Sequence, residues 1–488
     1  MNDMNKLLEK YRKIPIPLKA SIWFIFCNIL LKGISFFTAP MFARLLSTEE
    51  YGKLSIFASY EQIIIIFATW EVGLSPFQRG IFKFKENIRT FRSVIIFFSM
   101  LTSLIVTVII LCFGAEIVKF TEMPIWLLLV LLLYTFVYTA YVSWMTENKL
   151  NYNYRHVSIM TISMAIIQIL CSMTAVTKIK ATAEIKLLFT LLPAIIVSSI
   201  LFFKRFKPLQ IIRNGSVAKE QLRFLLVFTW PLVIHSLSYL VLGQADRIMI
   251  GKMVSNSAAG LYSVSYTIAS VVIIVQSGVL QVLSPWIYHQ MDRKSFDVIR
   301  KKMLSIFFLV SALYILFMLI APDVIICMYP EYYWEGIWCI PPISMGVYFM
   351  FMYSLFVAIE ECLDQTKYVA LVSITCALIN LLLNYLGIKL FGYIACAYTT
   401  LFCYILFAVG HYYFMSKILK QKYNDAKVYD GRLFFVVSLI MLVIMVGITF
   451  SYNNRIIRYS LAVIMMIFGI ANKKKILSIL SQFKQNSN

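Results

Sequence analysis

The feature that most constrains this chain is a series of continuous apolar segments separated by short polar loops. Each segment is about 20 residues long, the length at which a helix crosses the hydrocarbon core of a bilayer. A helix also pairs its backbone groups within itself, as a segment in lipid must. Hydrophobic residues make up 60% of the chain and charged residues 14%, far from the composition of a soluble domain. We therefore predict an all-α integral membrane protein.

Apolar windows predict fourteen membrane-spanning helices. They cover residues 18–43, 51–74, 93–114, 124–145, 157–177, 184–203, 224–246, 258–288, 303–321, 336–359, 369–388, 391–415, 432–451 and 456–471. The domain organisation expected from them is a six-helix lobe over 1–203, a cytoplasmic linker over 204–223, a second six-helix lobe over 224–415, a cytoplasmic loop over 416–431, two additional helices over 432–471 and a cytoplasmic tail over 472–488.

Basic residues predict the orientation of these helices. The chain has 45 Lys and Arg residues against 23 Asp and Glu, and most of them fall in loops on the same side as the N-terminus, such as 83–92, 204–223 and 292–302. Cytoplasmic loops of membrane proteins carry such an excess, so we expect both termini in the cytoplasm. This location of the charge favours a topological role over nucleic-acid binding.

Two similar phrases lie 208 residues apart, "FARLLSTEEYGKLS" at 42–55 and "IGKMVSNSAAGLYS" at 250–263. In register, Arg44 aligns with Lys252, Ser47 with Ser255 and Gly52 with Gly260. Each phrase follows the first helix of a six-helix set. Since six is even, the sets enter the membrane in the same direction, which predicts a parallel repeat about a pseudo-two-fold axis along the membrane normal. Two such lobes predict a central cleft of the kind secondary transporters expose alternately to each side.

Charged residues inside the predicted spans are candidates for function. Lys32 lies near the middle of the first helix, where an unpaired charge costs at least about 2.5–3.5 kcal/mol. It is expected to face the cleft and hold an anionic group, or to snorkel or pair with an acid for packing. Glu61 reaches a comparable depth and is its natural partner, either in a structural ion pair or as a binder of protons or sodium. Asp246 and Arg247 are expected to end the seventh helix, at an external gate or as a cap in water.

Other chemistry is not indicated. The nine cysteines are scattered and form no metal-binding pattern, and no phosphate-binding G-x-x-x-x-G-K-[ST] loop occurs. His235 and His411 stand alone on apolar faces, where a packing role is expected. We predict no cofactor, no metal site and no enzymatic activity.

The phrases "FARLLSTEEYGKLS" (42–55) and "QADRIMIGKMVSNSAAGLYSVSYTI" (244–268), together with fourteen spans and basic inner loops, resemble the Wzx-type polysaccharide flippases of the multidrug/oligosaccharidyl-lipid/polysaccharide exporter superfamily. The resemblance implies a two-lobed bundle in the bacterial cytoplasmic membrane. It would move an undecaprenyl-pyrophosphate-linked oligosaccharide, a unit of O-antigen, capsule or exopolysaccharide, from the inner to the outer leaflet. The resemblance also implies membrane lipids, a polysaccharide polymerase and a chain-length regulator as partners.

Within that resemblance, each candidate residue has an expected role. The cations Lys32, Arg44, Arg247 and Lys252 are expected to meet the pyrophosphate. The acids Glu61 and Asp246 are expected to serve ion coupling or gating.

Two alternatives stay open. An ion-coupled multidrug exporter would use a deep acid such as Glu61 to bind cationic cargo. A multispanning oligosaccharide polymerase or ligase would need a sizeable external loop with acids, bases or arginines. The predicted external loop at 322–335 has no Lys, Arg or His, which disfavours the enzyme.

Overall fold

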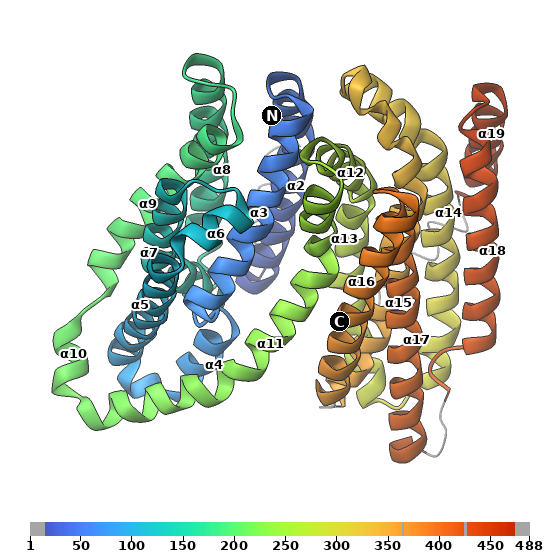
Figure 1. The fold of residues 1–488 in the computed structure, drawn as a ribbon. Helices are drawn as coiled ribbons and strands as arrows, with labels where there is room; N and C mark the ends of the chain where they lie inside the picture. The colour runs from blue at the N-terminus through green and yellow to red at the C-terminus, as the bar shows by residue number, and fades with distance from the viewer. Residues whose placement is uncertain (1–14, 364–365, 424–426, 474–488) are drawn as a thin grey trace, which may run out of the picture. The chain divides into compact units, whose positions relative to one another are not determined.

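The computed structural model describes residues 15–363, 366–423 and 427–473, and nearly all of them are helical (Figure 1). No strand occurs among these residues. The predicted all-α architecture is thus confirmed. Residues 474–488 of the predicted tail and 424–426 of the predicted loop lie outside the described part of the chain.

The chain divides into two compact units. Unit 1 comprises Met1–Leu46 and Lys53–Leu240, and unit 2 comprises Ser47–Gly52 and Val241–Asn488. The division passes through two helices, so α3 and α11 each contribute residues to both units.

Unit 1 contains the first part of the helical series. Its elements are α2 (Ile16–Leu45), most of α3 (Thr48–Thr69), α4 (Ser75–Lys83), η1 (Lys85–Asn87), α5 (Ile88–Cys112), α6 (Gly114–Thr121), α7 (Ile125–Leu150), α8 (Tyr154–Lys178), α9 (Ala183–Arg205), α10 (Pro208–Arg213) and the larger part of α11 (Gly215–Met253). The expected linker at 204–223 is thus largely helical, in α10 and the start of α11.

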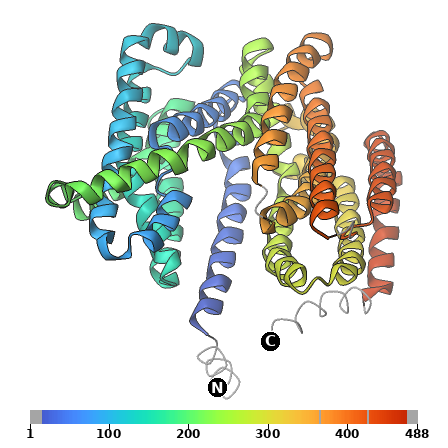
Figure 2. The ribbon, with the colours of Figure 1, turned by 90° about the horizontal axis from the view of Figure 1, so that it is seen from below.

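Unit 2 contains the remaining helices. They are the end of α11, α12 (Asn256–Ala269), α13 (Val271–Asp292), α14 (Phe296–Met328), η2 (Glu331–Cys339), α15 (Ile340–Cys362), α16 (Thr366–Phe391), α17 (Ala395–Tyr423), α18 (Gly431–Ser451) and α19 (Arg455–Ala471). Within this unit, α15 packs against α17, and α18 and α19 lie beside α14 (Figures 1 and 2).

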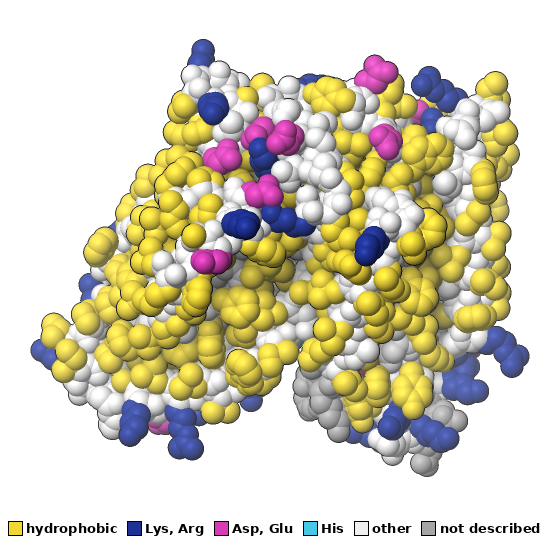
Figure 3. Space-filling view, viewed as in Figure 1, with side chains coloured by type: hydrophobic (Ala, Val, Ile, Leu, Met, Phe, Trp, Pro, Cys, Tyr) yellow, Lys and Arg dark blue, Asp and Glu magenta, His cyan; other side chains and the backbone are white. Residues whose placement is uncertain are grey.

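Twelve helices of the described chain are long and apolar enough to cross a membrane. The two other predicted spans correspond to α3, which opens with Glu49 and Glu50, and to α19, which has 17 residues. In the space-filling view, hydrophobic side chains cover most of the visible face of each unit, and charged side chains lie mainly toward the upper and lower ends, with most of the visible Asp and Glu in the upper half (Figure 3). This distribution is the one expected of a multi-pass membrane protein.

The predicted eighth span, 258–288, corresponds to one of these twelve, Asn256–Asp292, which is interrupted at a single residue. Ser270 separates α12 from α13, and its hydroxyl donates to the carbonyl oxygen of Thr267 at 2.9 Å. The apolar run alone did not reveal this break.

The aligned residues of the two phrases have the same local roles. The Ser47 hydroxyl accepts the backbone N–H of Glu50 at 3.1 Å, and the Ser255 hydroxyl accepts that of Ala258 at 3.1 Å. The matched serines therefore cap α3 and α12 in the same way.

The matched glycines also contact reciprocally inside unit 2. A β-carbon at Gly52 would collide with the carbonyl oxygen of Asn256, and one at Gly260 would lie 2.5 Å from that of Thr48. Thr48 and Asn256 are themselves aligned by the 208-residue offset. The first turns of α3 and α12 thus pack backbone to backbone, which requires glycine at both positions.

Candidate functional site

Asp246 on α11 lies at the centre of a buried polar network in unit 2. Its side chain is 1% exposed. Tyr262 of α12 donates to Oδ2 at 2.5 Å, Thr400 of α17 donates to the same oxygen at 2.9 Å, and Asn384 of α16 donates to Oδ1 at 2.6 Å. Four helices therefore meet at one carboxylate.

A second set of bonds extends the network along α16 and α17. Asn384 donates to Oδ1 of Asn380, and Asn380 donates to the Thr400 hydroxyl, both at 3.1 Å. Thr399 donates to Oδ1 of Asn384. The cluster is therefore rich in oxygen atoms and contains a single acid. Oxygen ligands are those that hard cations prefer, and one carboxylate at membrane depth suits a proton or a monovalent cation.

The position of Asp246 corrects two expectations. Asp246 and Arg247 do not end the seventh helix, because α11 continues to Met253. Burial also excludes the expectation of a cap in water. The prediction ended the helix here because two charged residues follow Ala245. The helix continues because these side chains have hydrogen-bond partners within the protein.

Arg247 has partners of its own in unit 2. Its side chain is 8% exposed, and Nη1 donates to the backbone oxygen of Gly243 at 2.8 Å and to Oε1 of Gln244 at 2.7 Å. The guanidinium lies 4.4 Å from the ring centroid of Tyr266, a cation–π distance. The guanidinium also interacts electrostatically with the Asp246 carboxylate.

Glu61 belongs to a polar cluster in unit 1. Among the described residues, its electrostatic partner is Lys186 of α9 rather than Lys32. The Lys186 ammonium lies 5.1 Å from the ring centroid of Phe42. Tyr134 and Tyr138 of α7 also lie within electrostatic range of Glu61. The half-buried acid thus has a lysine and two tyrosines as neighbours.

The other predicted cations are exposed. Lys32 is exposed on α2, and Arg44 and Lys252 are exposed in the last turns of α2 and α11, at matched positions of the repeat. Exposure leaves their charged groups accessible to a ligand.

Several residues of these clusters were not found from sequence. Lys186, Asn380 and Asn384 lie in apolar runs, and only the i, i+4 spacing of the two amides in "NLLLN" was a signal, since it places them on one helix face. Glu71 of unit 1 is another polar residue that the sequence did not indicate. It follows α3 with φ of 50° and accepts the Ser236 hydroxyl at 2.5 Å.

His411 does not stand alone as expected. Its Nδ1 lies 2.9 Å from Oε2 of Glu360, and both side chains are fully buried between α15 and α17. Tyr353 stacks on the imidazole with ring centroids 5.7 Å apart. Glu360 gave no signal in the sequence, because it lies just beyond the predicted end of the span 336–359.

The clusters consist of ionisable and amide side chains within apolar helices, an arrangement typical of membrane transport proteins. A family model described as "Polysaccharide biosynthesis protein" matches residues 18–291, more than half of the chain. The chain belongs to this family. The resemblance inferred from its sequence is thereby confirmed.

Solved structures show the fold of this polysaccharide biosynthesis protein. It is similar to the lipid II flippase MurJ in an inward closed conformation, with a TM-score of 0.64 and 17% identity over 94% of this chain and 100% of that one. An inward-facing multidrug resistance MATE family transporter of the MOP superfamily gives a TM-score of 0.64 and 12% identity, over 81% and 96% of the two chains.

A MOP superfamily transporter from Pyrococcus furiosus gives a TM-score of 0.53 and 14% identity, over 82% and 96%. No curated protein matches the sequence. The protein is therefore a multi-pass membrane protein with the fold of MOP-superfamily transporters.

Proposed function

We propose that this protein is a flippase that moves a lipid-linked oligosaccharide, an undecaprenyl-pyrophosphate-linked repeat unit, from the inner to the outer leaflet by alternating access. The proposal rests on one combined observation: the chain belongs to a polysaccharide biosynthesis family, and its fold is similar to that of a lipid II flippase. The physical need is clear, because the charged and hydroxylated head of such a lipid cannot cross hydrocarbon unaided. The polyprenyl tail can remain in lipid throughout.

The exposed cations are the groups proposed to meet the pyrophosphate. Arg44 and Lys252 lie at matched helix ends and Lys32 lies within α2, all with exposed side chains. Lysine and arginine bind phosphate through charge-assisted hydrogen bonds. Arg247 has bonds to its own helix, so its proposed contribution requires a rearrangement of its guanidinium.

Asp246 and Glu61 are proposed as the coupling or gating acids. Asp246 has the stronger basis, since its buried carboxylate accepts from the Tyr262 and Thr400 hydroxyls and from the Asn384 amide nitrogen, and the two hydroxyl oxygens would also contact a proton or a monovalent cation. Binding would exchange the present donors for the ion. Glu61, with Lys186 beside it, is the corresponding acid of unit 1.

The proposed setting is the bacterial cytoplasmic membrane, with both termini in the cytoplasm, as the distribution of Lys and Arg favours. A polysaccharide polymerase and a chain-length regulator, which would act on the flipped unit, are proposed partners.

Reconstitution in liposomes tests this function. A fluorescent lipid-linked oligosaccharide would be incorporated with the protein, and its access to a membrane-impermeant quencher would be measured with and without an imposed proton or sodium gradient. We expect protein-dependent access, reduced by Lys32→Ala. Access equal to that of protein-free liposomes would refute the flippase.

A drug-efflux assay distinguishes the flippase from the main alternative, an ion-coupled multidrug exporter. An exporter of cationic drugs should fail with Glu61→Gln and tolerate Lys32→Ala. Efflux of a cationic dye with this pattern, without movement of the lipid, would favour the exporter.

A further inference from the structure

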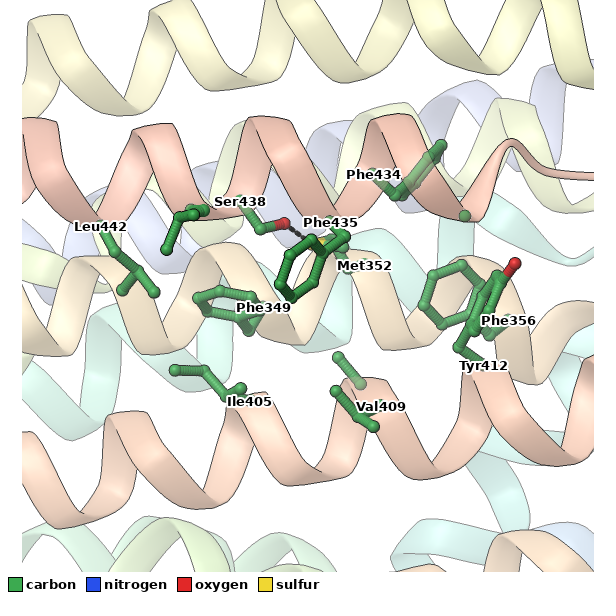
Figure 4. Close-up of a pocket in the computed structure, with 13 residues that line it drawn as sticks. Phe349, Met352, Phe356, Ile405, Val409, Tyr412, Phe434, Phe435, Ser438 and Leu442 are labelled. Atoms are coloured by element: carbon green, nitrogen blue, oxygen red, sulfur yellow. Dashed lines mark hydrogen bonds between the residues drawn. The ribbon is translucent and has the colours of Figure 1, made fainter.

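Two cavities of unit 2 adjoin one another at the start of α18. The first, of about 270 Å³, is a groove formed by α15, α17 and α18. Phe349 and Met352 line it from α15, Val409 from α17 and Leu442 from α18 (Figure 4). Its one serine, Ser438, donates its hydroxyl to the Met352 sulfur at 3.4 Å. The groove therefore offers an apolar surface to a ligand.

The second cavity, of about 540 Å³, is polar and basic. Arg300, Lys427 and Arg432 line it, and among the residues that the structure describes Asp430 is the one acid of the lining. Asp430 accepts the backbone N–H of Leu433 at 3.2 Å and caps α18, and Arg300 also pairs with Asp297 at 2.8 Å. In the described lining, three cations face one acid, which makes this part of the cavity complementary to an anion.

Tyr412 and Gly431 line both cavities. A β-carbon at Gly431 would collide with the Tyr412 hydroxyl, so α17 and α18 approach closely where the groove meets the basic cavity. One ligand with an apolar chain and an anionic head would fill both.

The length of the groove identifies the class of ligand. Gly431 and Leu442 are the first and last residues of α18 that line it, and a rise of 1.5 Å per residue separates them by about 16 Å. This is about half of the roughly 30 Å hydrocarbon core, the depth of a single leaflet. An acyl chain of a phospholipid fits this depth. The basic cavity lies where the loops predicted to be cytoplasmic begin, which corresponds to the inner leaflet.

We propose that α15, α17 and α18 bind one anionic phospholipid of the inner leaflet, with its phosphate at Lys427 and Arg432 and an acyl chain in the groove. This site is separate from the polar clusters proposed to serve transport, and the lipid is a bound component of the protein rather than its cargo.

Native mass spectrometry of the full-length protein tests the site. Purified protein in detergent would be titrated with phosphatidylglycerol or phosphatidylcholine, and the fraction carrying one lipid would be measured. We expect phosphatidylglycerol to bind preferentially, and the double variant Lys427→Gln/Arg432→Gln to lose that affinity by about tenfold or more. The matched control is Lys417→Gln/Lys420→Gln, which removes two exposed cations of α17 that do not line either cavity.

A second pair of variants tests the groove. Val409→Trp fills it and should reduce phosphatidylglycerol binding, whereas Val443→Trp changes an exposed residue of α18 outside it and should not. Equal binding of the two phospholipids, or equal losses in the basic-cavity variant and its control, would overturn the proposal.

Two competitor arms identify the ligand's source. Displacement of the lipid by inorganic phosphate would assign the cavity to a free anion, and preferential binding of a polyprenyl phosphate would assign it to the transported lipid. Either result would overturn the proposal. Neither depends on whether the liposome assay detects flipping.

Discussion

The reciprocal glycine contact predicts that a single methyl group at Gly260 destabilises the protein. A β-carbon there would lie 2.5 Å from the Thr48 carbonyl oxygen and 3.2 Å from the Gly52 nitrogen. Both neighbours are backbone atoms in helical turns, so neither can rotate away. Overpacking of this kind costs about 1–3 kcal/mol of unfolding free energy. Gly52→Ala should cost at least as much, because its β-carbon would meet the Asn256 carbonyl even more closely.

Thermal unfolding of the purified protein, followed by intrinsic fluorescence, measures this effect. A loss of 1–3 kcal/mol lowers the midpoint by roughly 2–12 °C in a unit of this size. The double variant Gly52→Ala/Gly260→Ala should show less than the sum of the single effects, since both changes separate the same two helices.

Gly447→Ala is the matched control. Gly447 lies within α18 of the same unit, and a β-carbon there would meet no atom within 4 Å. Alanine is favoured over glycine in a helix by about 0.5–1 kcal/mol, so this variant should be neutral or slightly stabilising. If Gly260→Ala unfolded at the same temperature as Gly447→Ala, the backbone contact between α3 and α12 would be refuted.

Three further predictions concern the buried charges. Asp246→Asn should abolish the response of lipid flipping to an ion gradient in liposomes, while the protein remains folded; a retained response would exclude this acid as the coupling group. Glu147→Gln should lower the unfolding free energy by about 1–3 kcal/mol, because its carboxylate pairs with two arginines and is 14% exposed. The control is Glu220→Gln, which should change the unfolding free energy little, because Glu220 pairs with Lys83 on the surface and is 63% exposed. Equal shifts of the unfolding midpoint in the two variants would contradict this reasoning. Glu360→Ala should lower the unfolding free energy by about 1–3 kcal/mol, because it leaves the buried His411 without its partner. Glu360→Gln keeps a hydrogen-bonding group and should lower it less. A thermal unfolding midpoint of Glu360→Ala equal to or above that of Glu360→Gln would contradict this.

Some of the fold could be predicted because it depends on local sequence. The length of an apolar run decides whether a helix can span a bilayer, and this property is read from a window of about 20 residues. The two repeated phrases were likewise visible, and the structure gives Ser47 and Ser255 the same capping bond. The one-residue interruption at Ser270 was not visible, because it lies within an otherwise apolar run.

The partners of the polar side chains were decided only by the tertiary structure. The sequence identified Asp246 and Glu61 as acids at membrane depth, but their partners Asn384 and Lys186 lie on helices more than a hundred residues away. Helical periodicity says which residues share a face, whereas the packing of several helices decides which faces meet. Hydropathy therefore determined that this chain enters the membrane as helices, and helix packing determined which buried charge meets which donor.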